Sequence, residues 1–206
     1  MKSRPYKLLS TLLRYPDERL VEARDEVAAA AAALPRSPEK PGVERFVAYL
    51  LQSSPNELAQ RYVETFDLRR RTSLYLSYYL HGDTRKRGMA LLRLKRLYAA
   101  AGLELVREEL PDYLPLMLEF AALAPDGAGE GLLREHRAAL ELLRANLHEA
   151  ASPYAHLLDA VCSGLPRLTA IERRHVHALA ETGPPDERVG LQPFAPPEVM
   201  PVEART

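Results

Sequence analysis

Asp112 and Glu119 are the two carboxylates whose spacing could support acid–base chemistry. They stand seven residues apart, so on a helix their side chains share one face. Such a pair can act as general acid and base only inside a pocket that perturbs the two pKa values. Helical spacing does not by itself indicate such a pocket, and we therefore predict no catalytic residue.

No other set of residues indicates an enzyme. The sequence holds no Gly-rich phosphate loop, no nucleophile elbow and no His-Glu-x-x-His zinc motif. Cys162 is the single cysteine, and its apolar helical surroundings indicate a buried structural thiol. We predict a protein that is not an enzyme, with no metal site and no cofactor of its own. A helical enzyme or nucleotide-binding protein is the weaker alternative.

The charge balance bears on the kind of partner. Lysine plus arginine and aspartate plus glutamate both total 28, so no net positive field covers the whole surface, although local patches remain possible. The basic clusters 69–71 and 85–87 lack interleaved aromatics, which favours solvated or ion-paired faces over nucleic-acid binding. No apolar run is long enough for a transmembrane helix, so we expect no direct membrane insertion and any membrane association to come through a partner. One cysteine favours a reducing, cytoplasmic location.

Apolar residues recur at helical spacing, and β-branched runs are scarce. We predict an all-α fold, a single-domain bundle of roughly nine to ten helices over residues 1–182, with an irregular Pro-rich tail over 183–206. Capping boxes at Ser54–Glu57 and Thr169–Glu172 mark two helix starts. Asp112 is the predicted N-cap of a helix ending near Ala124. A glycine-rich link, Gly127–Gly131, is expected to precede one long helix reaching about Glu149.

Four segments carry a resemblance to a known family. They are Leu8–Asp17 (LLSTLLRYPD), Tyr62–Leu68 (YVETFDL), Tyr78–Leu92 (YYLHGDTRKRGMALL) and Glu109–Ala122 (ELPDYLPLMLEFAA). Together they closely resemble the nitrate reductase molybdenum cofactor assembly chaperones, the delta-subunit or NarJ family, over most of residues 1–181. Many relatives in the wider group of redox-enzyme chaperones have Asp-His where this chain has Asp112-Tyr113. A role carried by that histidine is therefore not transferred here.

The resemblance implies a chaperone that binds the apo catalytic (alpha) subunit of nitrate reductase, mainly through that subunit's N-terminal segment. It also implies that the chaperone keeps the apoenzyme competent for cofactor insertion and delays its membrane docking. The client would carry a bis-guanine-dinucleotide molybdenum cofactor and an iron–sulfur cluster, whereas the chaperone would hold no cofactor permanently. A chaperone for another molybdoenzyme of the same class is the alternative.

The helix after Asp112 is the first candidate for binding a client peptide, because an amphipathic peptide helix can lie in an apolar groove with charges at its rim. One face, with Tyr113, Met117 and Phe120, is expected to be core. The opposite stripe mixes acids and leucines, and ordinary surface charge is its alternative interpretation. The candidate residues are Glu109, Asp112, Tyr113, Leu116, Glu119 and Leu123, with Tyr62, Phe66 and Asp67 as the second choice. We expect lysine at Asp112 and Glu119 to weaken peptide binding without unfolding the protein.

Overall fold

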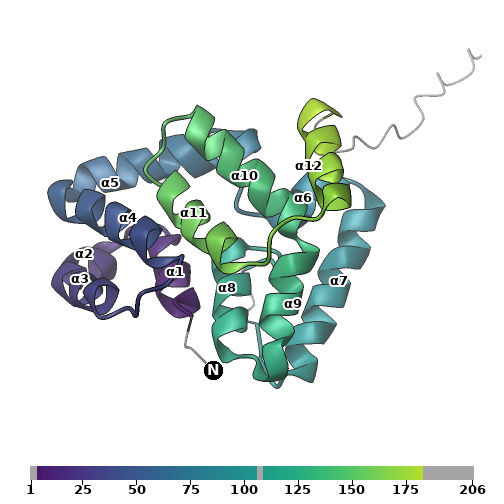
Figure 1. Cartoon of the computed structure of the whole chain (residues 1–206), viewed down its shortest axis with the longest axis horizontal. Coiled ribbons are helices and arrows are strands. Elements are labelled where there is room, and N and C mark those ends of the chain that lie inside the picture. Colours follow the sequence, from purple (N-terminus) through teal and green to yellow (C-terminus); the bar gives the residue numbers. More distant parts are fainter. Residues whose placement is uncertain (1–3, 106–108, 183–206) are drawn as a thin grey trace, which may run out of the picture.

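The computed structural model of the protein describes residues 4–105 and 109–182, apart from the side chains of Asp126, His175 and Thr182. Within these ranges the chain is all helical, and its one β-type contact is an isolated bridge between Tyr75 and Tyr113. The predicted all-α class is therefore confirmed (Figure 1). The predicted Pro-rich tail, 183–206, lies outside the described residues.

Six helices form the N-terminal part of the described chain. They are α1 (Tyr6–Leu12), α2 (Glu18–Glu22), α3 (Arg24–Ala32), α4 (Lys40–Gln52), α5 (Pro55–Tyr62) and α6 (Leu76–His81). A π-helical turn, Val63–Asp67, extends α5, and a short 3-10 turn, Arg70–Thr72, precedes α6. The capping box predicted at Ser54 is confirmed, because the Ser54 hydroxyl accepts the Glu57 amide while the Glu57 carboxylate accepts the Ser54 amide.

Six further helices complete the described bundle. They are α7 (Arg85–Ala100), α8 (Leu114–Leu123), α9 (Ala128–Glu135), α10 (Arg137–Glu149), α11 (Ala155–Gly164) and α12 (Ala170–Thr182). Ten of the twelve α-helices have seven or more residues, in line with the predicted nine to ten. The pair Thr169 and Glu172 caps α12 as predicted.

The glycine-rich segment is not the predicted link. Gly129 and Gly131 lie inside α9, and the chain bends at His136 before α10 begins, so two helices replace the predicted long one. The reason is packing: a Cβ at Gly129 would lie 2.2 Å from the Ala121 Cα. Here glycine allows α9 to approach α8 closely rather than forming a loop.

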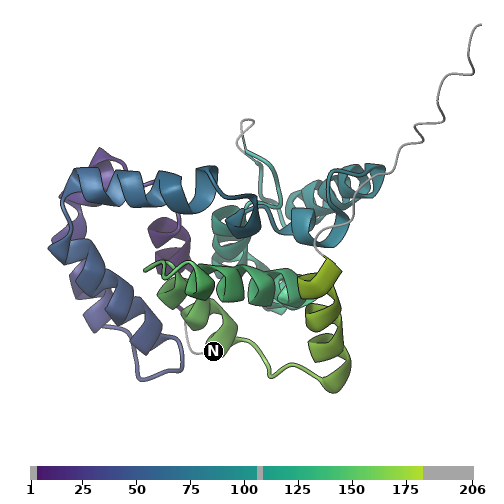
Figure 2. The ribbon, with the colours of Figure 1, turned by 90° about the horizontal axis from the view of Figure 1, so that it is seen from above.

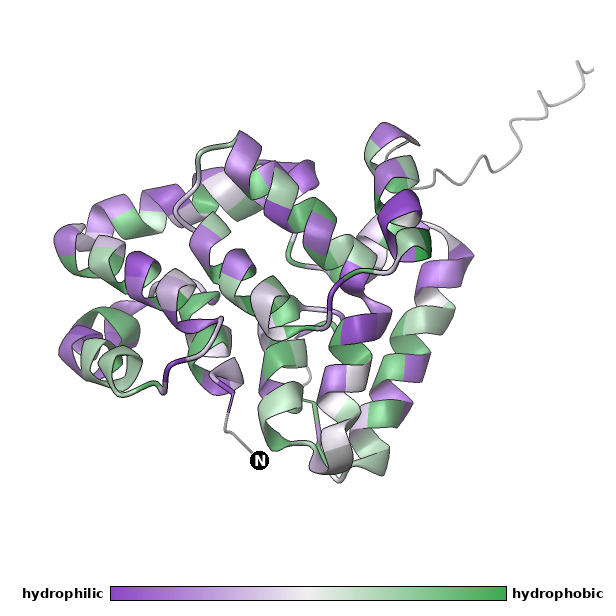
Figure 3. Ribbon diagram, in the orientation of Figure 1, coloured by the Kyte–Doolittle hydropathy of each residue, from purple (hydrophilic) through white to green (hydrophobic). Residues whose placement is uncertain are grey.

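The helices pack around one continuous apolar core. Figures 1 and 2 show α1, α8 and α11 near its centre; α1 packs on α8, α11 packs on α4 and α10, and α8 packs on α9. Most helices carry both apolar and polar residues, as Figure 3 shows, whereas α8 has Glu119 as its one charged residue. Leu9, Leu118 and Leu158 are fully buried, and Cys162 is buried as predicted, with burial raising the pKa of its thiol to about 12. None of the helices described here combines the length and apolar content needed to cross a bilayer.

Candidate functional site

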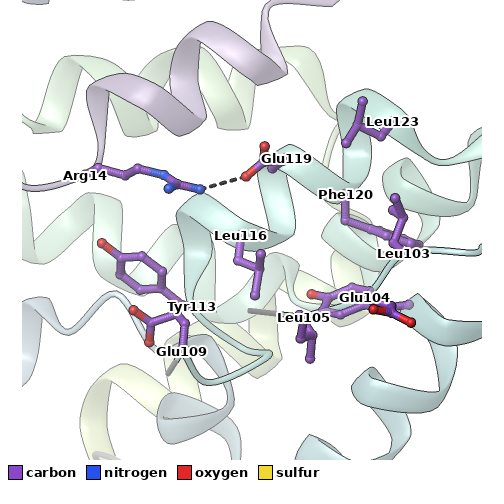
Figure 4. A pocket seen from close by; sticks show the side chains of 11 residues that line it. Arg14, Leu103, Glu104, Leu105, Glu109, Tyr113, Leu116, Glu119, Phe120 and Leu123 are labelled. Atoms are coloured by element: carbon purple, nitrogen blue, oxygen red, sulfur yellow. Dashed lines mark hydrogen bonds and ion pairs between the residues drawn. The ribbon is translucent and has the colours of Figure 1, made fainter. Parts of the chain in front are cut away.

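A pocket of about 540 Å³ lies along α8. Its walls come from α8, from the segment that follows α7 and from the end of α1, as Figure 4 shows. The residues that line it are Arg14, Tyr98, Leu103, Glu104, Leu105, Glu109, Tyr113, Leu116, Glu119, Phe120 and Leu123. We call this pocket the α8 groove. It brings together five of the six first-choice residues predicted from the sequence.

The two faces of α8 explain how the groove forms. Leu114, Met117 and Leu118 are fully buried and hold the helix on the core. Leu116 is half-buried and Leu123 is exposed, and both line the groove. Leu116 and Leu123 therefore give the groove apolar lining that is not packed in the core.

Asp112 is not part of the groove, although the sequence pattern places it among the candidate peptide-binding residues. The residue is 0% exposed, and its Oδ2 accepts the Ser77 amide at 3.2 Å and the Ser77 hydroxyl at 2.5 Å. The Arg87 guanidinium lies 3.6 Å from the same oxygen. Asp112 thus caps the start of α6 from across the fold, whereas its own helix α8 has Tyr113 as N-cap with no side-chain cap. Lysine at this buried position would break the fold rather than leave it intact.

Glu119 lies in the groove as predicted, but its charge is already paired. The Nη2 of Arg14 lies 2.6 Å from one carboxylate oxygen, and the Lys7 ammonium bonds the other. Both cations belong to α1 or its end, so this ion pair joins α1 to α8 along the edge of the groove. Because two cations face it, Glu119 adds little net negative charge.

The unpaired acids of the groove are Glu104 and Glu109. No described cation lies within ion-pair distance of either carboxylate. Glu109 accepts hydrogen bonds from the Tyr75 hydroxyl at 3.0 Å and from the Leu110 amide at 2.9 Å, which holds its carboxylate in place. Sequence reasoning missed Glu104, Leu103, Leu105 and Arg14, since they lie outside α8 and only folding brings them to it.

Tyr113 sits between the groove and the core. It is half-buried rather than fully in the core, and its hydroxyl lies 3.2 Å from the Tyr62 hydroxyl. Burial raises the pKa of both phenols above the ordinary value, so both stay neutral and able to donate hydrogen bonds. Tyr113 therefore lines the groove while its hydroxyl contacts the buried Tyr62.

The second-choice residues do not line the groove. Tyr62 and Phe66 are buried, with ring centroids 4.9 Å apart, and Phe66 also packs on Tyr154 at 4.8 Å. This confirms the expectation of core packing for the two aromatics. Asp67 is exposed and lines a separate, smaller pocket that also contains Arg69 and Arg70.

The arrangement is suited to binding an apolar segment that carries basic groups. Apolar side chains line it together with the carboxylates of Glu104 and Glu109. In the part of the chain that the structure describes, no group of three or more His, Cys, Asp or Glu side chains is placed to hold a metal ion.

Sequence comparison finds a matching family model and similar bacterial proteins. The family model for the nitrate reductase delta subunit matches residues 37–160. A protein of Bacillus subtilis (strain 168), assigned as a nitrate reductase molybdenum cofactor assembly chaperone NarJ, is 36% identical over 166 residues, covering 79% of this chain and 89% of that protein. NarJ of Escherichia coli (strain K12), a chaperone of the same description, is 37% identical, covering 74% and 65%.

Two further similarities extend the comparison. The nitrate reductase-like protein NarX of Mycobacterium tuberculosis (strain ATCC 25618 / H37Rv) is 40% identical over 76% of this chain, which spans only 24% of that longer protein. The crystal structure of an Archaeoglobus fulgidus protein, described as a candidate redox enzyme maturation protein, matches with a TM-score of 0.57 at 24% identity. That match covers 76% of this chain and 89% of the other, and it shows a shared fold. With a family model over 37–160 and a bacterial relative aligned along 89% of its length, this chain belongs to the nitrate reductase delta subunit family of NarJ-type proteins.

Proposed function

We propose that this chain is an assembly chaperone that binds the apo catalytic subunit of a respiratory nitrate reductase, mainly through that subunit's N-terminal segment. Relatives aligned over most of this chain are named as nitrate reductase molybdenum cofactor assembly chaperones and not as catalysts. The observation that carries the binding mode is the α8 groove, an apolar pocket lined by two acids, Glu104 and Glu109, that no described cation pairs with.

The groove is large enough to receive the anchoring side chains of a short amphipathic helix. Its volume of about 540 Å³ falls within the roughly 300–1,000 Å³ of ligand pockets, which is enough for a few anchoring side chains. Leu116, Phe120 and Leu123 follow one another at helical spacing, so anchors three or four residues apart on a peptide helix can pack along them.

The charges define the rest of the client segment. Glu104 and Glu109 favour a lysine or arginine beside the apolar anchors, because a cation there meets carboxylates that no described cation pairs with. Glu119 is held by Lys7 and Arg14 and therefore contributes to the groove mainly as part of its wall. The expected segment thus carries apolar anchors on one side and basic residues at the rim.

Holding this segment would serve assembly in two ways. It would keep the apo catalytic subunit competent for insertion of its molybdenum cofactor, and it would delay membrane docking until insertion is complete. The client carries the cofactor and the chaperone holds none permanently. A chaperone for another molybdoenzyme of the same class is the second candidate, because a few groove contacts can set the choice of client.

The test is capture of the catalytic subunit, co-expressed with and without its first few dozen residues. We expect capture by the wild-type chaperone and loss of capture when these residues are removed. Capture that does not depend on them would contradict the proposed binding mode, and capture of a different molybdoenzyme instead would favour the second candidate.

Matched variants test the groove itself by calorimetry with the N-terminal peptide. Leu123→Ser and Glu104→Lys should each weaken binding about tenfold or more, since an anchor contact or a favourable charge is lost. Leu68→Ser and Glu22→Lys make the same changes at exposed positions away from the groove, and they should bind as the wild type does. Equal affinities for the groove variants and their controls would remove the peptide from the α8 groove.

A further inference from the structure

The longest helix of the described chain, α7, carries an unusual charge. Its sixteen residues, RKRGMALLRLKRLYAA, include six lysines and arginines and no acid. The whole chain is neutral, so this excess is local. A concentration of positive charge on one helix attracts negatively charged partners.

The outward face of α7 also exposes apolar side chains. Met89 is 69% exposed and Leu92 is 41% exposed, and they lie three residues apart on the same face. Arg96, one turn beyond Leu92, shares this face, and Lys95 flanks it. The inward face holds the helix on the protein through buried Leu94 and Tyr98. The exposed apolar pair is therefore not needed for packing.

Ion pairs among the described residues leave part of the positive charge of this helix without a counter-charge. Arg87 is turned inward to Asp83 and Asp112, and Arg93 pairs with Glu135 at 3.0 Å. For Lys86, Lys95 and Arg96, no carboxylate among the described residues lies within ion-pair distance. Three cations thus surround the exposed apolar pair without an internal counter-charge.

We propose that the outward face of α7 docks on an anionic lipid surface. Apolar side chains flanked by lysines and arginines on one helical face are the pattern of interfacial helices, whose apolar groups enter the headgroup region while the cations contact lipid phosphates. Figure 1 places α7 at an edge of the molecule, where a flat surface can reach it.

This contact differs from the sequence-based expectation that membrane association comes only through a partner. It also leaves the α8 groove accessible, because Tyr98 lines that groove from the inward face of the same helix. One helix therefore presents its outward face to lipid while its inward face supports the groove. Docking on lipid does not depend on the proposed client.

Vesicle co-sedimentation of the full chain tests the proposal. The probes are vesicles of phosphatidylcholine alone and vesicles containing about one-third phosphatidylglycerol at low salt, where electrostatic attraction is strong. We expect binding to the anionic vesicles only, with the affinity falling about fivefold for each cation removed and so about 25-fold for Lys95→Gln/Arg96→Gln. Met89→Ser/Leu92→Ser should cost about tenfold or more, since two apolar groups no longer enter the interface.

Controls of equal chemistry separate α7 from the rest of the surface. Arg69→Gln/Arg70→Gln removes two exposed cations elsewhere, and Ile171→Ser removes an apolar side chain that is 71% exposed on α12. Both should bind the anionic vesicles as the wild type does, and circular dichroism checks that every variant is folded. Equal losses in α7 and control variants, or no anionic binding by the wild type, would overturn the proposal. Binding of polyglutamate but not vesicles would assign the face to an acidic protein and overturn it as well.

Discussion

Replacing Asp112 with alanine tests the structural role that the fold assigns to this carboxylate. The residue is fully buried, and its Oδ2 receives two hydrogen bonds from Ser77 and faces the Arg87 guanidinium. Alanine would leave the Ser77 amide and hydroxyl without this acceptor at the start of α6. It would also leave Arg87 with one carboxylate fewer.

The size of the loss follows from these contacts. A hydrogen bond to a charged group contributes roughly 1.5–3 kcal/mol, so two give roughly 3–6 kcal/mol. Arg87 keeps its bond to Asp83 and is partly exposed, which limits the penalty for its lost partner. We therefore expect Asp112→Ala to lower the free energy of unfolding by about 3–4 kcal/mol. At roughly 2–4 °C per kcal/mol for a chain of this size, Tm falls by roughly 6–16 °C.

Urea unfolding and thermal unfolding, both followed by circular dichroism, measure this change. Glu119→Ala is the matched control, because its carboxylate is partly exposed and bonded to two cations at the surface, where such pairs contribute about 1 kcal/mol or less. If Asp112→Ala unfolded at the same urea concentration as the control, the assignment of Asp112 as the cap of α6 would be refuted.

Two further predictions concern the α8–α9 contact and the effect of pH. Gly129→Ala should lower the free energy of unfolding by about 3 kcal/mol or more, since the added Cβ would meet the α8 backbone. Gly131→Ala, whose Cβ would have nothing within 4 Å, should raise the free energy of unfolding by about 0.5–1 kcal/mol. Urea titration measures both changes, and equal effects of the two variants would contradict the close contact between α8 and α9. Burial lowers the pKa of His136 in the folded state, so unfolding takes up a proton at acid pH. Stability should therefore fall as the pH drops below about 6.5, by up to about 1.4 kcal/mol per pH unit, and His136→Gln should show a smaller fall in urea titrations at pH 7 and 5.

The helical content could be predicted because its signals are local. The Ser54 and Thr169 capping boxes act over four residues, and their hydrogen bonds occur where the sequence places them. Burial of Met117 and Phe120 likewise follows from spacing along one helix. Each of these features depends on neighbours within one or two turns.

The predictions for Gly129 and Asp112 were wrong because each residue type can serve two structural roles. Glycine at 129 suggested a loop, yet it serves a helix contact that depends on Ala121 in another helix. Asp112 suggested the cap of its own helix, yet its carboxylate caps α6, 35 residues earlier in the chain. A cap and a close contact can both be made across the fold, and sequence spacing does not distinguish the local use from the distant one.

By itself, the sequence determined the all-α class, the apolar faces that form the core and the resemblance to a chaperone family, because periodicity, capping and motifs are written along the chain. Only the tertiary structure decided which acids line the groove without a cation partner. Asp112 was buried by its contacts with α6, Glu119 was paired with Lys7 and Arg14, and Glu104 was brought to the groove from beyond α7. The physical reason is that the burial and ion pairing of a carboxylate depend on the residues around it, and these come from segments that lie far apart in sequence.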